Sequence, residues 1–255
     1  MKIVLFVFVL ALAGTAQARE LSASRIATGV VAPNRAVTLS AKIMGRVEQV
    51  TREEGETVKA GGLLLSIADA EWRAGLLSAQ AALARADAEY SYKKKMEAKM
   101  KALFEQRTVS EDMVDQAALD AEVARASLQS AEASVALAQT RLDETHINAP
   151  FDAVVINKSA EVGQMTAPGQ PLFVIEDHSR LKFRTAVKER DVTAIKPGQK
   201  ARVTIDALGG AELKGVVAKV IPSGDPVTHS YTVEISLPPR KGVYPGMFGK
   251  AEFGD

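Results

Sequence analysis

Few residues of this chain have a type and spacing that could do chemistry. Only three histidines are present, and His146, His178 and His229 lie in separate segments. Zinc sites take their ligands at short, fixed spacings and often include cysteine, of which the chain has none. No nucleophile motif and no phosphate-binding glycine loop occurs. We therefore expect no catalytic residue, no metal site and no cofactor, and a function that consists of binding.

The composition limits the kind of protein and the kind of partner. The 255 residues carry a net charge of +1 and are 47% hydrophobic, which allows two or three small domains. A nearly neutral chain lacks the basic face that duplex binding requires, so nucleic acid is excluded as the main partner. Only 5% of the residues are aromatic, which is typical of an elongated protein with thin cores.

The first eighteen residues have the features of an export signal. Lys2 supplies a short positive region, Ile3 to Ala13 are apolar, and Ala16-Gln17-Ala18 matches an A-x-A cleavage site. The alternative is an uncleaved membrane anchor, but the apolar run is shorter than the roughly 20 residues that span a bilayer. We expect cleavage after Ala18 and a soluble periplasmic protein, without a lipid because no cysteine is available to carry one.

The rest of the chain is organised around a helical stretch from Trp72 to Thr145, which has no proline and, after Gly75, no glycine. Its second half combines two heptad series, one mainly of large aliphatic residues and one mainly of alanine. They are Val114, Ala121, Leu128, Val135 and Leu142, and, three positions later, Ala117, Ala124, Ala131, Ala138 and Thr145. This pattern indicates the a/d seam of a coiled coil.

The first half of the stretch has the same design. Leu76, Leu83 and Tyr90 form one series and Trp72, Ala79 and Ala86 the other; the pattern weakens at Lys93 and Glu97 and resumes at Met100 and Phe104. The two seams meet around Arg107, which predicts an antiparallel hairpin of two equal arms, each about 50 Å long at 1.5 Å per residue. The alternative is one part of a larger helical bundle, but the flanking sequence supplies no other long helix.

The segments on either side of the hairpin, Lys42 to Ile67 and Pro150 to Ile175, repeat each other without gaps. Matching residues are 108 positions apart: Val47 and Val155, Gly55 and Gly163, Gly61 and Gly169, Leu64 and Leu172, Ile67 and Ile175. Each half has about four short strands and is too small to bury a core, so we expect the halves to pack together as a pseudo-symmetric sandwich. The structural turn residues of the two halves are predicted to be Gly45, Gly55, Gly61, Gly163 and Gly169.

Further strands are expected at both ends of the chain. Thr28 to Leu39 alternates in the manner of strands, with a turn at Pro33-Asn34. Beyond Arg180, turn residues separate runs that predict a small antiparallel barrel, with one helical turn at Asp191 to Ile195. The runs are Leu181 to Val187, Ala201 to Ile205, Gly215 to Ile221, Tyr231 to Leu237 and Met247 to Phe253.

These motifs resemble a known family. The pattern G-x-V-x-x-V followed by G-x-x-V-x-x-G-x-x-L is similar to a biotinyl/lipoyl half-motif. A split lipoyl domain with an inserted helical hairpin is the arrangement of the periplasmic adaptor subunits, or membrane fusion proteins (hemolysin D-like), of tripartite efflux systems. Later segments resemble the β-barrel domain of those adaptors: Val187-Lys188-Glu189, Ile195 to Gln199, Gly215 to Pro222 and Tyr244 to Phe248.

The resemblance implies a fold of mixed α and β class that is elongated. A long antiparallel coiled-coil hairpin is inserted in a split lipoyl-like β-sandwich, and a small antiparallel β-barrel follows. The expected parts are a signal peptide (1–18), N-terminal strands that join the barrel (19–39), lipoyl-like half 1 (40–69), the hairpin (70–145), lipoyl-like half 2 (146–178) and the barrel (179–255). The membrane-proximal domain of the family is expected to be absent or vestigial.

The function implied by the resemblance is not enzymatic. The chain would link an inner-membrane efflux transporter to an outer-membrane channel protein and would self-associate into a ring, which is hexameric in the family. The transporter would be a proton-driven pump of the resistance–nodulation–division (RND) class, and the chain would lie at the periphery of the inner membrane. The alternative within the family is an adaptor of an ATP-driven exporter or type I secretion system.

A prosthetic-group carrier is the alternative of a different class. Carriers of the biotinyl/lipoyl type need a lysine on an exposed hairpin between the two halves, and here the helical insertion occupies that place. Lys42, in Ala41-Lys42-Ile43-Met44, is superficially similar. It falls opposite Pro150 at the start of a half-motif, however, so we do not expect it to carry a group.

The resemblance also points to the tip of the hairpin. Family members that dock on an outer-membrane channel carry an Arg-x3-Leu-x6-Ser pattern there, and this chain has Lys99, Leu103 and Ser110 at that spacing. Lysine keeps the charge of arginine but loses its planar fork, so we expect the contact with the channel to be weaker or altered. The alternative is a local role, because Ser110 followed by Glu111 and Asp112 is a good helix N-cap.

Overall fold

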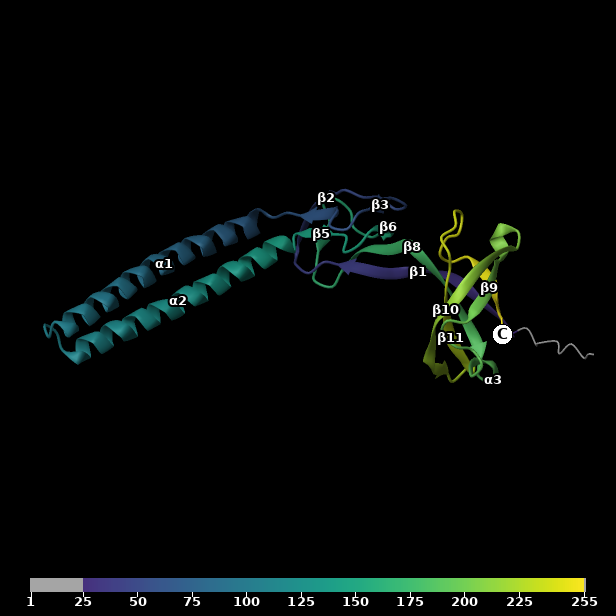
Figure 1. Ribbon diagram of the computed structural model, residues 1–255. Helices are drawn as coiled ribbons and strands as arrows, with labels where there is room; N and C mark the ends of the chain where they lie inside the picture. Colours follow the sequence, from purple (N-terminus) through teal and green to yellow (C-terminus); the bar gives the residue numbers. More distant parts are fainter. Residues whose placement is uncertain (1–24, 255) are drawn as a thin grey trace, which may run out of the picture. The chain divides into compact units, whose positions relative to one another are not determined.

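The computed structural model describes residues 25–254 (Figure 1). Pro33–Arg180 form one compact unit, and residues 25–32 and 181–254 belong to the other. Two long strands, β1 (Arg25–Ser40) and β8 (Pro171–Lys188), contribute residues to both units. The predicted signal peptide lies outside the described residues. No helix within residues 25–254 has both the length and the apolar character needed to cross a membrane.

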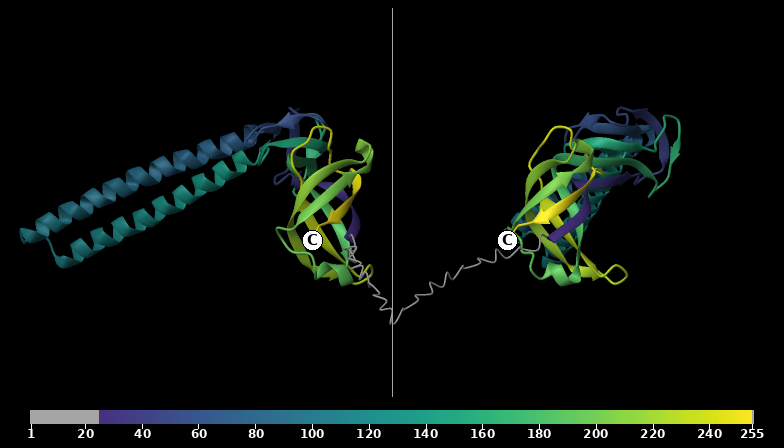
Figure 2. Two further views of the ribbon diagram at one scale, coloured as in Figure 1. Left: turned by 45° about the vertical axis from the view of Figure 1, so that its right-hand side comes forward. Right: turned by 90° about the vertical axis from the view of Figure 1, so that its right-hand side faces the viewer.

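The central stretch is an antiparallel helical hairpin, as predicted. Helix α1 (Ala70–Glu105) has 36 residues and α2 (Glu111–Asp143) has 33, so each is about 50 Å long. The helices lie side by side in all views (Figures 1 and 2). The turn is at the predicted midpoint: Arg107 has a φ of 57°, and the Thr108 N–H donates to the Leu103 carbonyl at 3.0 Å.

The seam follows the predicted register along α2. The predicted seam residues from Val114 to Leu142 are half-buried, except for Ala121 and Ala124, which are fully buried. Alanine at these layers lets the two backbones approach closely. The prediction for Phe104 is wrong, because this side chain is 42% exposed and Leu103 is the half-buried residue instead. Phe104 lies in the last turn of α1, and α2 begins only at Glu111, so no opposing helical turn covers it.

The segments that flank the hairpin fold as two related halves. The first contains β2 (Gly45–Val50), β3 (Thr57–Val58) and β4 (Leu63–Ile67); the second contains β6 (Ala153–Lys158), β7 (Met165–Thr166) and the start of β8. Every strand start in the second half lies 108 residues after its counterpart, as the sequence repeat predicts. A short strand, β5 (His146–Asn148), follows α2 and pairs with β4.

The halves exchange strands. β2 of the first half pairs with β7 of the second, and β6 of the second pairs with β3 of the first. Even an irregularity is repeated, because the register shift after Val47 in β2 recurs after Val155 in β6. The shared core contains symmetry-related pairs that are almost wholly buried, such as Leu64 with Leu172 and Ile67 with Ile175. Neither half could bury these residues alone.

Four of the predicted turn glycines have positive φ: Gly55, Gly61, Gly163 and Gly169, at 86°, 77°, 89° and 86°. A side chain would be strained there. Gly45 is not in a turn. It begins β2, and an added Cβ would clash with Ile67, so close packing rather than backbone conformation requires this glycine.

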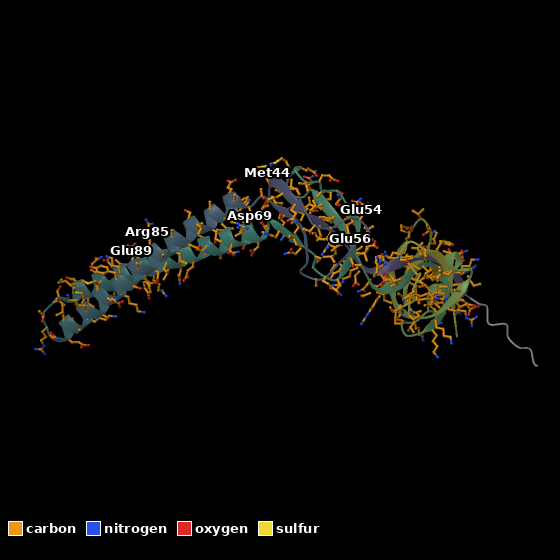
Figure 3. The ribbon with its side chains drawn as sticks, turned by 90° about the horizontal axis from the view of Figure 1, so that it is seen from above. Met44, Glu54, Glu56, Asp69, Arg85 and Glu89 are labelled. Atoms are coloured by element: carbon orange, nitrogen blue, oxygen red, sulfur yellow. The ribbon has the colours of Figure 1, made fainter. Side chains whose placement is uncertain are left out.

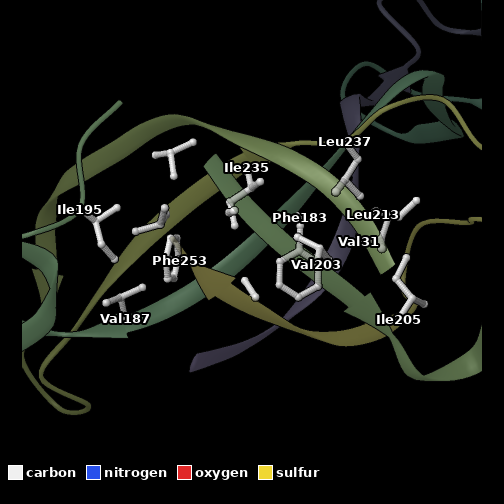
Figure 4. Close-up of a cluster of buried hydrophobic side chains, with 14 of the residues drawn as sticks. Val31, Phe183, Val187, Ile195, Val203, Ile205, Leu213, Ile235, Leu237 and Phe253 are labelled. Carbon is white, nitrogen blue, oxygen red and sulfur yellow. The ribbon is translucent and has the colours of Figure 1, made fainter. Parts of the chain in front are cut away.

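The second unit is a β-barrel. Its strands are the start of β1, the end of β8, β9 (Lys200–Ile205), β10 (Ala211–Asp225), β11 (Ser230–Ser236) and β12 (Phe248–Phe253). The order is β1-β12-β9-β10-β11-β8, and β1 also pairs with β8. At this closure the Thr185 hydroxyl donates to the Thr28 carbonyl at 2.7 Å. Figure 4 shows the core, in which Phe183, Val203, Ile205 and Ile235 are completely buried.

Three local expectations differ from the structure. β1 continues through Pro33-Asn34, where a turn was expected; the Asn34 side chain instead donates to the Asp177 carboxylate at 2.7 Å. The helical turn α3 (Glu189–Val192) begins two residues before the expected one, and a 3₁₀ turn, η1 (Asp206–Leu208), follows β9. β10 extends to Asp225, whose carboxylate accepts from the Val227 and Thr228 N–H groups in the β10–β11 loop.

Candidate functional site

The candidate site is the distal end of the hairpin, formed by the last turns of α1, residues 106–110 and the first turn of α2. The three residues singled out in the sequence lie in this region. Lys99 is exposed on α1, Leu103 is half-buried one turn later, and Ser110 is the exposed residue immediately before α2. The structure therefore presents a cation, an apolar side chain and a hydroxyl near one end of the hairpin.

Lys99, like Lys95, differs from the other lysines in the distal half of α1. Lys93 binds Asp120 at 2.7 Å, Lys101 pairs with Glu97, and Lys94 lies 5.5 Å from the centre of the Tyr90 ring. Within residues 25–254 Lys99 has no ion-pair partner. Its ammonium group is therefore available to an acidic group of another molecule.

Ser110 occupies the N-cap position of α2, with φ −76° and ψ 159°, but its side chain makes no capping hydrogen bond. Glu111 and Asp112 supply negative charge in the first turn, which stabilises the positive end of the helix dipole. The Ser110 hydroxyl therefore does not make the capping hydrogen bond that the interpretation of Ser110 as a helix N-cap requires.

A groove of about 340 Å³ lies between the helices beside the tip. Its lining includes Met96, Met100 and Met113, together with Tyr92. Met113 and Tyr92 are 49% and 60% exposed. Sequence reasoning identified only Met100, as a seam residue; the concentration of three of the chain's seven methionines within 18 residues was the available signal. Methionine adapts its shape readily, which suits a contact surface.

The residues at the base of this groove explain why the heptad pattern of the seam weakens at Lys93. Lys93 occupies a seam position, and its ammonium group donates to Asp120 of α2 at 2.7 Å, while Gln116 also donates to Asp120 at 2.9 Å. The hydrogen bond to Asp120 raises the pKa of Lys93, and the bond from Lys93 lowers the pKa of Asp120. A polar bridge therefore replaces the apolar layer and leaves the groove open beside it.

The other residues considered for chemistry are dispersed. The His146 ring contacts the Thr145 hydroxyl at 2.8 Å, His178 contacts Glu176 at 2.9 Å, and His229 lies in the β10–β11 loop with a φ of 47°. Within residues 25–254 no three His, Cys, Asp or Glu side chains are grouped to hold a metal. Lys42, the residue that superficially resembles a carrier lysine, faces Glu144 at 3.6 Å.

One buried carboxylate was not foreseen. Asp177 is 3% exposed and accepts hydrogen bonds from Asn34, from Arg35 and from both the N–H and the hydroxyl of Ser179. Burial by itself would raise the pKa of Asp177, but these hydrogen bonds, led by that of Ser179, outweigh it and lower the pKa to about 2. Asp177 thus joins β1 to β8 and has a structural role.

Comparison with known proteins finds relatives that align with long parts of this chain. The macrolide export protein MacA of Yersinia pestis is 28% identical over 243 residues, which cover 87% of this chain and 66% of MacA. The multidrug resistance protein MdtA of Escherichia fergusonii is 31% identical over 176 residues, which cover 68% of this chain and 42% of MdtA. The structure of MacA from Actinobacillus actinomycetemcomitans shares the fold, with a TM-score of 0.72 at 22% identity, over 91% of this chain and 78% of that one.

The chain spans about three fifths of the length of other curated relatives, such as 59% of the uncharacterized protein YdhJ of Escherichia coli.

Two family models together match most of this chain. The family described as "CusB-like, beta-barrel domain" matches residues 183–255, and the one described as "CzcB-like, barrel-sandwich hybrid domain" matches residues 35–177, which is more than half of the chain. The chain therefore belongs to the membrane fusion proteins, a family of non-enzymatic periplasmic adaptors.

Proposed function

We propose that this protein is a periplasmic adaptor that links an inner-membrane exporter to an outer-membrane channel, and that the hairpin tip docks on the channel. The observation that carries the docking proposal is the tip itself, where Lys99 lacks an ion-pair partner and the Ser110 hydroxyl makes no cap bond. Leu103 lies between them in the sequence and supplies an apolar contact. The names of the relatives, macrolide export protein and multidrug resistance protein, support a role in export.

The exporter, in this proposal, is a proton-driven pump of the RND class. The match of residues 183–255 to an RND-type, CusB-like barrel supports this choice. An ATP-driven exporter is the second candidate, because the relatives include MacA of an ATP-driven system as well as MdtA of an RND system. The proposal also includes export by a cleaved signal peptide, attachment to the inner membrane through the transporter alone, and self-association into a ring. The boundaries between the parts of the chain, placed after residues 39, 69, 145 and 178, remain a prediction.

Cross-linking in the cell envelope, followed by purification through a tag on this chain, tests the proposal. The expected result is recovery of one inner-membrane transporter and one outer-membrane channel, and the class of the transporter decides between proton-driven and ATP-driven pumps. Absence of both membrane proteins would overturn the adaptor function.

A substitution at the tip tests docking separately. Leu103→Asp should abolish recovery of the channel and export, retain the transporter, and leave helicity by circular dichroism unchanged. Ala136→Asp, an exposed change on α2 about 26 residues from the tip, is the matched control and should recover both partners. Full recovery of the channel by Leu103→Asp would contradict docking through the tip.

A further inference from the structure

The groove between the two helices beside the tip has the dimensions of a small-molecule site. It runs along α1 from Tyr92 to Met100, which is about 12 Å at 1.5 Å per residue. Figure 3 draws the side chains of the hairpin and labels Glu89 of α1, three residues before the groove begins. The volume of about 340 Å³ is within the range of pockets that bind small ligands. A groove of this size suits a compact organic molecule.

The space exists because Ala117 faces Met96 across the seam. The Lys93–Asp120 ion pair, at 2.7 Å, shows which residues face each other: its residue numbers add up to 213, as 96 and 117 do. The alanine side chain ends at Cβ, so part of this layer is left unfilled between the helices. The methionines that line the groove have flexible, unbranched side chains, which can adapt to a bound molecule.

The lining of the groove carries a net negative charge. Its charged residues are Lys93, Asp112 and Asp120, and Lys93 and Asp120 bind each other, so their charges cancel. Asp112 is exposed and has no ion-pair partner within residues 25–254. Tyr92, which is 60% exposed, adds an aromatic ring, and such rings attract cations. The groove therefore favours a positively charged ligand over a negatively charged one.

We propose that this groove binds lipophilic organic cations, which combine one positive charge with an aromatic apolar body. The apolar body lies against the methionines and Tyr92, and the positive charge lies near Asp112. Lys95 and Lys99, which have no ion-pair partner within residues 25–254, do not line the groove, so the uncompensated charge of the lining is that of Asp112. The inference goes beyond the proposed function, which gives the chain no small-molecule ligand.

Two ions of the same shape and opposite charge test the site. Tetraphenylphosphonium and tetraphenylborate are titrated separately into the purified chain at low ionic strength, and binding is followed by calorimetry. The cation should bind about ten-fold more tightly than the anion, because Asp112 attracts one and repels the other.

Substitution of the carboxylate tests its part in this preference. Asp112→Asn should weaken binding of the cation about five-fold, the upper range for an exposed ion pair, and should narrow its advantage over the anion. The matched control is Asp115→Asn, which removes an exposed carboxylate of α2 that does not line the groove. Both affinities should be unchanged in this control.

The methionines report where the cation binds. In protein labelled at the methionine methyl groups, the cation should shift the NMR signals of Met96, Met100 and Met113. Met44, which is labelled in Figure 3, and Met165 lie in the lipoyl-like halves and are 66% and 59% exposed. Their signals should not move, whereas nonspecific adsorption to exposed apolar side chains would shift them as well.

Four outcomes would overturn the inference: equal affinities for the two ions, equal losses with Asp112→Asn and Asp115→Asn, shifts that Met44 and Met165 share, or no binding. None of these measurements involves the membrane partners. Failure of cation binding would therefore leave the adaptor function intact, and failure to recover the membrane partners would leave the cation site intact.

Discussion

The lipoyl-like halves and the hairpin use opposite kinds of core. Leu64, Leu65, Ile67, Leu172 and Ile175 of the sandwich are 0% exposed, whereas α1 has no fully buried residue and α2 has only Ala121 and Ala124. The sandwich concentrates its hydrophobic burial in a few large side chains. The hairpin spreads a thin seam along about 50 Å, so its geometry depends on the sizes of small residues more than on the total apolar area buried.

The largest effect is expected in the sandwich. Leu172→Ala removes a completely buried side chain and should lower the free energy of unfolding by about 2–5 kcal/mol, measured by chemical denaturation. Leu137→Ala deletes the same atoms from a side chain that is 54% exposed on α2, and its cost should be below about 0.5 kcal/mol. Similar costs at the two positions would remove the distinction between the two cores.

In the hairpin, adding bulk should do more harm than removing it. Ala124→Leu places a large side chain where the helices are closest, and overpacking of this kind typically costs about 1–3 kcal/mol. Thermal melting followed by circular dichroism at 222 nm should show the loss, while Ala136→Leu, exposed on the same helix, should melt like the unsubstituted protein. Equal shifts at the two positions would mean that the seam register is wrong.

The buried carboxylate of Asp177 should make the sandwich sensitive to acid. Its pKa of about 2 lies below the ordinary value of 3.8, so it stabilises the fold above about pH 4, and this contribution is lost as the pH falls towards 2. Asp177→Asn should lower stability at pH 7 by up to about 2 kcal/mol, and its difference from the unsubstituted protein should shrink between pH 4 and pH 2. A difference that stays constant with pH would contradict this role.

The smallest effect on stability is expected at the tip. A lost N-cap bond costs about 1 kcal/mol, but Ser110 makes no such bond, so Ser110→Ala should change the melting temperature very little while reducing recovery of the channel. Ser127→Ala, an exposed serine in the middle of α2, is a control for the loss of a hydroxyl and should not affect recovery. Destabilisation by Ser110→Ala with normal recovery would favour the capping interpretation.

The features that the sequence predicted well are those set by patterns that recur within the chain. Heptad spacing placed the seam and the turn at Arg107, and the 108-residue repeat placed the strands and the four positive-φ glycines. These patterns are repeated many times, so a single exception, such as Phe104 at the end of α1, does not obscure them.

The features that were missed depend on distant partners. Pro33-Asn34 was expected to form a turn because its local sequence favours one, but Asn34 is held in β1 by Asp177, 143 residues away. Similarly, Glu234 on β11 is only 6% exposed because Lys182, Arg184 and Lys219 from two neighbouring strands surround it. The groove at Met96 and Met113 requires knowledge of which residues face each other across the hairpin. The contacts of Asn34 and Glu234 have no signature in the neighbouring sequence, and the cluster of methionines does not reveal which residues face them.

The exchange of strands between the lipoyl-like halves has a consequence for the order of folding. β2 cannot find its partner β7 until more than a hundred further residues have been synthesised, and the loop entropy of joining such distant segments slows folding. The helical hairpin shortens this path, because once its seam has formed, residues 70 and 143 are neighbours. We therefore expect the hairpin to act as an internal folding template: a local structure that forms first and brings the two incomplete halves together.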